Sequence, residues 1–312
     1  MKKVLILGAS GFVGNYLVQE LKSKNYIIYG ADIKDTEEKD YEEFFKVDIL
    51  NTIDIENVLE LIKPDYIINL IAISSVKKSW DNPALTFDIN VKGTINLLES
   101  VNKVSKSSRI LLIGSSEEYG NIDYSSAVLE ERSLRPINPY AISKLTQEKI
   151  ANMYKETYGL DIVLTRSFNH IGIGQEKGFV VPDFISQLIE IEKGNKSCDL
   201  IVGNLSAERD FTDVRDVVRA YRLILEKGRC GEVYNVGSGK TLSIQNILDL
   251  LIELSNISVK VAVDKNKFRK IETPKIQSDI SKIRSELGWE PQISIKDTLR
   301  EMLEFERVKS SK

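Results

Sequence analysis

The sequence predicts an α/β protein with a doubly wound parallel sheet, followed by a smaller C-terminal α/β domain. Short apolar runs alternate with amphipathic segments over the first half of the chain, and a glycine-rich turn follows the first apolar run directly. The 312 residues suit about two domains. Strand–helix alternation of this kind builds a parallel sheet with right-handed crossovers and with helices on both faces.

Six apolar runs in the first half are short enough to be strands that are buried on both faces. These expected strands are Val4–Leu7, Tyr26–Tyr29, Phe44–Val47, Tyr66–Ile71, Arg109–Ile113 and Asp161–Thr165. The segments between the strands are longer and amphipathic, which predicts helices. The expected helices are Phe12–Lys24, Ile53–Ile62, Ala84–Val104 and Tyr140–Tyr158.

After Arg166 the alternation is less regular, and we expect a second domain that packs tightly on the first because no flexible linker separates them. Its expected elements are a loop at Phe168–Gly178, helices at Phe179–Lys193, Asp213–Lys227, Ile244–Leu254 and Ile295–Phe305, and strands at Leu200–Val202 and Glu232–Val236. The predicted division is residues 1–166 and 167–312, with 210–238 returning to the first domain.

The composition excludes several classes of function. With 43 Lys and Arg against 46 Asp and Glu, the net charge of −3 gives no reason to expect binding to nucleic acid or to an anionic membrane. Two cysteines, Cys198 and Cys230, are too few for a disulfide framework. The single histidine, His170, argues against a histidine-rich metal site, and we expect no metal.

The apolar run at the N-terminus is interrupted from Gly8 onward, which makes it too short for an export segment. No stretch approaches the roughly 20 apolar residues that span a membrane. We therefore expect a cytoplasmic protein that does not enter a membrane.

The turn after the first strand has the spacing G-x-x-G-x-x-G. Glycines at these places permit a tight turn and a close approach of the backbone to a pyrophosphate, which then faces the N-terminus of the following helix. Because the turn stands between a strand and a helix, it indicates a dinucleotide-binding (Rossmann) domain. The residues expected to contact the cofactor here are Gly8, Ser10, Gly11, Phe12, Val13 and Gly14.

An acidic residue, Asp32, ends the second strand 18 residues after Gly14. It can accept hydrogen bonds from ribose hydroxyls and repels a 2′-phosphate, so it favours NAD(H) over NADP(H). Lys34 lies close in the sequence and could weaken this discrimination. Asp48 is placed to meet the adenine, although an ordinary solvated aspartate fits either position.

Tyr140 and Lys144 are spaced i and i+4, on one face of an expected helix. An ammonium group beside a phenol lowers the pKa of the phenol, and such a tyrosine can exchange a proton with a substrate oxygen. Ser115 and Ser116 follow an expected strand, at the sheet edge where ligands bind. By itself the Tyr-x-x-x-Lys pair would also suit a solvated helix face; behind a dinucleotide turn it indicates catalysis.

Together these motifs resemble the extended short-chain dehydrogenase/reductases that act on nucleotide sugars, over nearly the whole chain. The resemblance implies that Tyr140, Lys144, Ser115 or Ser116 assist a transfer between a nicotinamide and the substrate. It also implies that Asp32, Asp48, Ile49, Leu70, Ala72, Asn90, Tyr140 and Lys144 contact the cofactor. Helices 84–104 and 140–158 would form a homodimer interface.

The second half resembles the GDP-mannose branch of that family, in Ser167–Gly172, Gly203–Leu205, Arg209–Asp216 and Val233–Gly239. This implies a GDP-sugar substrate held between the domains. The residues implied to bind it are Asn169, Val180, Arg209, Arg269 and Glu272. In the Phe-Arg-Pro-x-Glu motif of the branch, Lys270 replaces the proline.

Within the branch, Gly11–Gly14 and Ile171–Gln175 resemble the reductases. This implies reduction of the C4 keto group of GDP-4-keto-6-deoxy-D-mannose by NAD(P)H, to GDP-D-rhamnose or its C4 epimer. Ser115-Ser116-Glu117 also resembles the 4,6-dehydratases, in which the glutamate would remove the C5 proton. A dehydratase, a nucleotide-sugar epimerase and a non-catalytic NAD-binding protein stay open as alternatives.

Overall fold

The structure is a computed structural model that describes residues 1–34, 36, 40–121, 125–195, 197–268, 271 and 273–310. Its main feature is a seven-stranded sheet in the order β11-β6-β5-β4-β1-β2-β3, in which all neighbours are parallel. The strands are β1 (Lys3–Leu7), β2 (Ile27–Asp32), β3 (Glu43–Lys46), β4 (Tyr66–Asn69), β5 (Arg109–Ser115), β6 (Ile162–Ser167) and β11 (Val233–Val236). The predicted fold class is confirmed.

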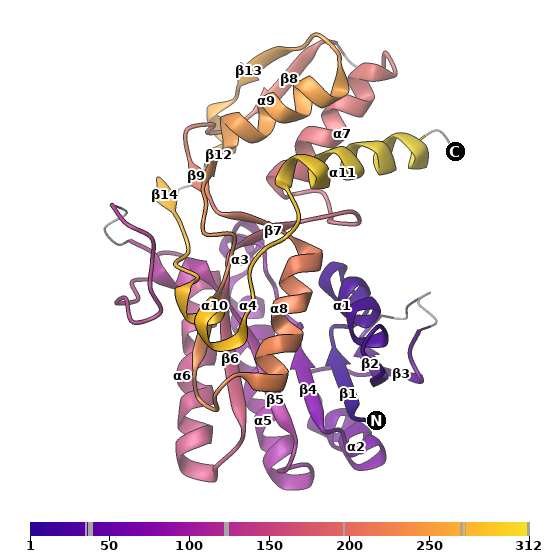
Figure 1. Cartoon of the computed structure of the whole chain (residues 1–312), viewed down its shortest axis with the longest axis vertical. Coiled ribbons are helices and arrows are strands. Elements are labelled where there is room, and N and C mark those ends of the chain that lie inside the picture. The colour runs from indigo at the N-terminus through magenta and orange to yellow at the C-terminus, as the bar shows by residue number, and fades with distance from the viewer. Residues whose placement is uncertain are drawn as a thin grey trace.

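Helices cover both faces of this sheet (Figure 1). Successive residues of a strand point to opposite faces, so Val4 and Ile6 of β1 belong to one core and Leu5 and Leu7 to the other. The first core is closed by α1 (Phe12–Lys22) and α8 (Val214–Lys227). The second is closed by α2 (Thr52–Ile62), α5 (Gly93–Val104) and α6 (Pro139–Tyr158).

A third core lies beyond the carboxyl ends of the strands, in the upper part of Figure 1. It is built by α7 (Val180–Glu192), α9 (Ile244–Ser255) and α11 (Ile295–Lys309), with the parallel pair β8 (Asp199–Val202) and β13 (Lys260–Val263). Short strands connect it to the sheet region: β7 (Asn169–Ile171), β9 (Glu208–Arg209), β10 (Phe211–Asp213), β12 (Leu242–Ser243) and β14 (Lys275–Ile276). The division of the chain at residue 166 stays a prediction.

Three local features differ from the expected elements. The helix expected over residues 84–104 is divided into α4 (Pro83–Phe87), a π-helical turn at Asp88–Lys92, and α5. A short helix, α3 (Val76–Asp81), precedes it because the Ser75 side chain accepts a hydrogen bond from Lys78 N. The loop expected at 168–178 contains β7, which pairs with β10. Among the described helices, none is long and apolar enough to cross a membrane.

The chain returns to the first core after α9. Helix α10 (Ser281–Leu287) is followed by Trp289, which is fully buried against α8 and donates its indole N–H to the Asp216 carbonyl at 3.0 Å. Through this side chain, residues close to the C-terminus pack against the sheet, most of which is formed by residues 1–167.

We predict that Trp289→Ala lowers the free energy of unfolding by about 3–5 kcal/mol, because it leaves a large cavity and an unpaired carbonyl. Urea unfolding followed by circular dichroism measures this loss. Trp80→Ala is the control, because that ring is 39% exposed. A loss below about 1 kcal/mol for Trp289→Ala would contradict the packing described above.

Candidate active site

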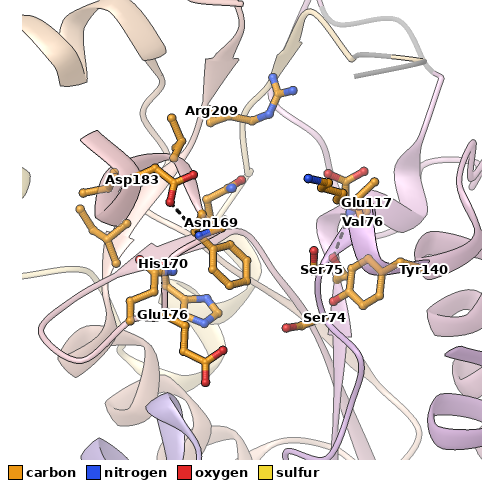
Figure 2. A pocket seen from close by; sticks show the side chains of 18 of the residues that line it. Ser74, Ser75, Val76, Glu117, Tyr140, Asn169, His170, Glu176, Asp183 and Arg209 are labelled. Carbon is orange, nitrogen blue, oxygen red and sulfur yellow. Dashed lines mark hydrogen bonds between the residues drawn. The ribbon is translucent and has the colours of Figure 1, made fainter. Parts of the chain in front are cut away.

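A cavity of about 920 Å³ lies at the carboxyl edge of the sheet, between the glycine turn and the elements of the third core. It is lined by residues from both sides. The sequence-predicted residues among them are Gly8, Gly11, Phe12, Val13, Gly14, Leu70, Ala72, Ser115, Ser116, Glu117, Tyr140, Lys144, Asn169, Val180 and Arg209. Figure 2 shows Glu117 and Tyr140 on one wall and Asn169, Asp183 and Arg209 on the other.

The glycine turn has the shape that a pyrophosphate needs. Gly8 has a φ of +79°, and a Cβ atom on Gly14 would lie 2.3 Å from the Ala9 carbonyl oxygen. Helix α1 begins after Gly11, and no side chain caps it. The N–H groups of its first turn, whose residues line the cavity, therefore have no side-chain acceptor. An uncapped helix N-terminus behind a glycine-rich turn fits a bound phosphate.

Ser10 and Asp32 form a pair beside this turn. The Asp32 carboxylate accepts hydrogen bonds from Ser10 Oγ at 2.8 Å and from Ile33 N at 2.7 Å. Ser10 N at 3.2 Å and Lys34 N at 3.5 Å donate to it as well, so donors of this chain use its roughly four lone-pair directions. The pair thus fixes the orientation of Asp32 at the end of β2.

Five expected cofactor residues do not line the cavity: Ser10, Asp32, Asp48, Ile49 and Asn90. Asp48 accepts from Leu50 N at 2.9 Å, and Ile49 is buried against Gly93. Asn90 is buried and links the Ile73 main chain to Ser143 of α6, at 2.8–3.2 Å. Asn90 therefore positions the segment after β4 relative to α6.

Tyr140 enters the cavity from the first turn of α6. Asn138 caps this helix by accepting a hydrogen bond from Ala141 N at 2.8 Å, and Pro139 occupies the first helical position. Burial raises the pKa of Tyr140 well above its usual value, and a hydrogen bond with Ser115 offsets part of this rise. At neutral pH the phenol therefore holds its proton and can donate it.

The Lys144 ammonium group contacts the end of β5. Its Nζ donates to the Ile113 carbonyl at 2.7 Å and to Gln147 Oε1 at 3.2 Å. Burial lowers the pKa of Lys144 to about 8, and the charge of Glu118 limits this fall. The expected lowering of the Tyr140 pKa is wrong for the protein without cofactor, because desolvation of the phenol outweighs its hydrogen bond with Ser115 and the nearby Glu118 and Glu117 raise the pKa further.

Ser115, Ser116 and Glu117 form the turn after β5. Ser115 Oγ accepts from Glu117 N at 3.2 Å, and Ser116 is buried. The Glu117 carboxylate accepts from Asn138 Nδ2 at 3.0 Å. The carboxylate is thus held in the cavity close to the start of the helix that bears Tyr140 (Figure 2).

Three of the five expected substrate residues line the opposite wall. Arg209 is 4% exposed and donates from Nη1 to the Glu208 carbonyl at 2.8 Å. Asn169 lies in β7, and Val180 begins α7. Arg269 and Glu272 lie outside the described residues. His170 stacks on Phe12 with a ring separation of 6.1 Å, and burial lowers its pKa.

Sequence reasoning missed part of the lining. Ser74 and Ser75 before α3, Trp80 within it, and Asp183 and Gln187 on α7 all face the cavity. The serine at the start of α3 was a readable capping signal. The polar residues of α7 were not readable as a site, because an amphipathic pattern does not tell a cavity wall from a solvated face. In the described ranges no group of three or more His, Cys, Asp or Glu residues is arranged to hold a metal ion.

Fold and site define a nucleotide-binding oxidoreductase, and comparisons with known proteins extend this. The family described as GDP-mannose 4,6 dehydratase matches residues 5–302. A GDP-6-deoxy-D-mannose reductase of Pseudomonas aeruginosa is 34% identical over 77% of this chain and 79% of its own. A GDP-6-deoxy-D-talose 4-dehydrogenase of Aggregatibacter actinomycetemcomitans is 30% identical over 96% of both chains. The chain belongs to the GDP-mannose 4,6-dehydratase family of extended short-chain dehydrogenase/reductases.

Solved structures agree with this assignment. The protein RMD of Pseudomonas aeruginosa, in complex with NADPH, superposes with a TM-score of 0.88 at 30% identity, covering 99% of this chain and all of that one. A dTDP-glucose 4,6-dehydratase of Streptomyces venezuelae, with NAD and TYD bound, gives 0.88 at 26% identity over 99% and 98% of the two chains. The family is therefore one of nicotinamide-dependent enzymes.

We predict that Gly14→Ala weakens dinucleotide binding at least about tenfold, which corresponds to roughly 1.4 kcal/mol. The added methyl group would push α1 away from the Ala9 main chain. Titration calorimetry with NADH and NADPH measures the affinity. Asn15→Ala, an exposed neighbour on the same helix, should bind like the wild type; equal affinity for both variants would contradict the contact.

Proposed function

We propose that the protein reduces the C4 keto group of GDP-4-keto-6-deoxy-D-mannose with a nicotinamide cofactor. The observation that carries the proposal is the buried, protonated Tyr140 hydrogen-bonded to Ser115 in a cavity that also contains a glycine turn for the cofactor. The relatives named as a GDP-6-deoxy-D-mannose reductase and a GDP-6-deoxy-D-talose 4-dehydrogenase support it.

In this proposal the Gly8–Gly14 turn and Asp32 hold the dinucleotide, which supplies a hydride when bound. Tyr140 donates its proton to the oxygen at C4, and Ser115 orients that oxygen by a hydrogen bond. Arg209 and Asn169 line the wall that faces the sugar diphosphate, for which a guanidinium is well shaped.

The proposal extends to assembly and domain roles. Residues 1–166 with 210–238 would hold the cofactor, and the rest of 167–312 would hold the GDP-sugar; the pairing of β11 with β6 supports the first part. A homodimer would pack α4 and α6 against their copies, since Leu85, Phe87, Ile142 and Met153 are 36–54% exposed there. Sedimentation of the whole chain as a monomer would contradict the dimer.

A 4,6-dehydratase is the second candidate, because Glu117 stands in the cavity with its carboxylate held by Asn138. In that reaction the glutamate would remove the C5 proton, and the hydride taken from C4 would return at C6. The nicotinamide would then be restored in each turnover, whereas a reductase consumes one reduced nicotinamide for each sugar.

The test is cofactor consumption. With GDP-4-keto-6-deoxy-D-mannose we expect loss of NAD(P)H absorbance in a 1:1 ratio to product, and little conversion of GDP-mannose. Glu117→Gln should then reduce the rate only modestly, because reduction at C4 needs no base at C5. Conversion of GDP-mannose without added reductant, abolished by Glu117→Gln, would establish the dehydratase instead.

We predict that Tyr140→Phe lowers kcat at least about a hundredfold, the usual scale for lost general acid catalysis. The affinity for the cofactor should change little. Steady-state kinetics with the keto sugar measure the loss. Tyr158→Phe, at the opposite end of α6, is the matched control; near-wild-type kcat in Tyr140→Phe would remove this phenol from the mechanism.

We predict that NADH is used at least as well as NADPH, because Asp32 repels a 2′-phosphate. Asp32→Ala should raise the ratio of kcat/KM for NADPH to that for NADH. Asp65→Ala, at the opposite edge of the sheet, should leave the ratio unchanged. A wild-type preference for NADPH of about tenfold, or 1.4 kcal/mol, would contradict the assignment.

A further inference from the structure

Glu118 is a fully buried carboxyl group directly beneath the catalytic turn, and the mechanism above does not use it. Its Oε1 accepts a hydrogen bond from Ser115 N at 2.7 Å, which closes a capping box over the turn Ser116–Tyr119. Its Oε2 is buried and has no hydrogen-bond partner within the described part of the chain. A buried carboxyl group with an unused oxygen is costly unless another charge compensates it.

The nearest arginine does not compensate it fully. Arg166 of β6 approaches Glu118 Oε2 only to 3.9 Å. Its Nε and Nη2 donate to Glu148 of α6 at 3.0 and 2.8 Å, and its Nη1 donates to Tyr119 Oη and to the Glu130 carbonyl. The guanidinium charge is therefore mainly engaged by Glu148.

The other cation is Lys144. Its ammonium group donates to the Ile113 carbonyl, and Glu118 accepts from the Ser115 amide, so both groups contact the same strand end. Gly114 lies between, and a Cβ atom there would come within 2.6 Å of Glu118 Oε1 and 2.3 Å of the Thr165 carbonyl. The glycine makes room for the carboxyl group at this place.

We propose that Glu118 is a positioning residue for the reduction: its carboxylate fixes the Ser115 turn and stabilises the ammonium form of Lys144 beside Tyr140. Only the effect of Glu118 on turnover depends on the proposed function. The electrostatic pairing itself is a property of the resting protein.

The charges around the pair support this role. Burial raises the pKa of Glu118 to about 8, with Glu148 adding to the rise and Arg166 and Lys144 opposing it. Burial lowers the pKa of Lys144 to about 8, and Glu118 is the charged group that opposes this fall. Glu117 and Tyr119 of the turn and Tyr140 of α6 are further titratable groups near the pair. Groups with such close pKa values titrate as a unit.

The sign of the effect follows from the charges. Once Glu118 is ionised, its negative charge favours the ammonium form of Lys144. Turnover that needs the ammonium form is present below the pKa of Lys144 and is lost above it. Removing the carboxylate lowers that pKa, so the alkaline limit of activity moves to lower pH.

The test is Glu118→Gln, which keeps an acceptor for Ser115 N and removes the charge. Glu130→Gln is the matched control, because it also removes a buried carboxylate, one bonded to Asn235 N at 2.8 Å. Lysine is labelled with ¹³C at Cε, and NMR follows the titration of Lys144 in the protein without cofactor. The Lys144 signal is identified by its absence in Lys144→Arg. The pH profile of kcat is measured in parallel.

We expect Glu118→Gln to lower the pKa of Lys144 and the alkaline limit of kcat together, by roughly one pH unit. Glu130→Gln should move neither. An unchanged Lys144 titration in Glu118→Gln overturns the proposal, even if stability falls. If that variant does not fold, ¹³C-labelled wild type decides: a Lys144 titration well below the alkaline limit of kcat also overturns the proposal. A shifted titration in a protein that reduces no keto sugar would reject the proposed function and keep the pairing.

Discussion

The main chain of three residues at the end of β5 determines where the side chains proposed for catalysis lie. The Ile113 carbonyl holds Lys144, and Gly114 leaves space for a buried carboxyl group. The Ser115 amide bonds Glu118, and the Ser115 side chain hydrogen-bonds Tyr140. These three residues pair with Thr165–Ser167 of β6, which fixes the position of this strand end in the sheet.

Burial at this edge sets the protonation of both Tyr140 and Lys144. Burial keeps Tyr140 protonated, which a proton donor for a carbonyl reduction requires. The same burial lowers the pKa of Lys144 to about 8, so the ammonium form needs a neighbouring negative charge to persist. Desolvation thus favours the neutral form of both groups, which raises the pKa of the phenol and lowers the pKa of the amine.

The sequence predicted the sheet and the glycine turn well, because both follow from local physics. Buried parallel strands are continuous apolar runs, and only glycine tolerates the contact between Gly14 and the Ala9 carbonyl. The π-helical turn at Asp88–Lys92 could not be predicted, since the apolar pattern runs through it unbroken. Strand β7 was not predicted, because its three residues are stabilised by pairing with β10, some forty positions later in the chain.

For the site, residue types were predictable and their surroundings were not. The i, i+4 spacing places Tyr140 and Lys144 on one face of a helix, but the lysine's partners, Ile113 and Gln147, depend on how α6 packs against β5. The spacing therefore suggested a lysine that lowers the phenol pKa, whereas desolvation raises it. Likewise, nothing in the sequence distinguishes buried Glu118 from its neighbour Glu117, which faces the cavity.

The central claim is that the cavity brings the nicotinamide and C4 of a GDP-keto sugar together. The most direct measurement uses NADH deuterated at the transferred position of the nicotinamide, with GDP-4-keto-6-deoxy-D-mannose, and locates the label in the product by NMR. The account predicts one deuterium at C4 of the hexose and none elsewhere. Product without deuterium at C4, or with deuterium at C6, would contradict it.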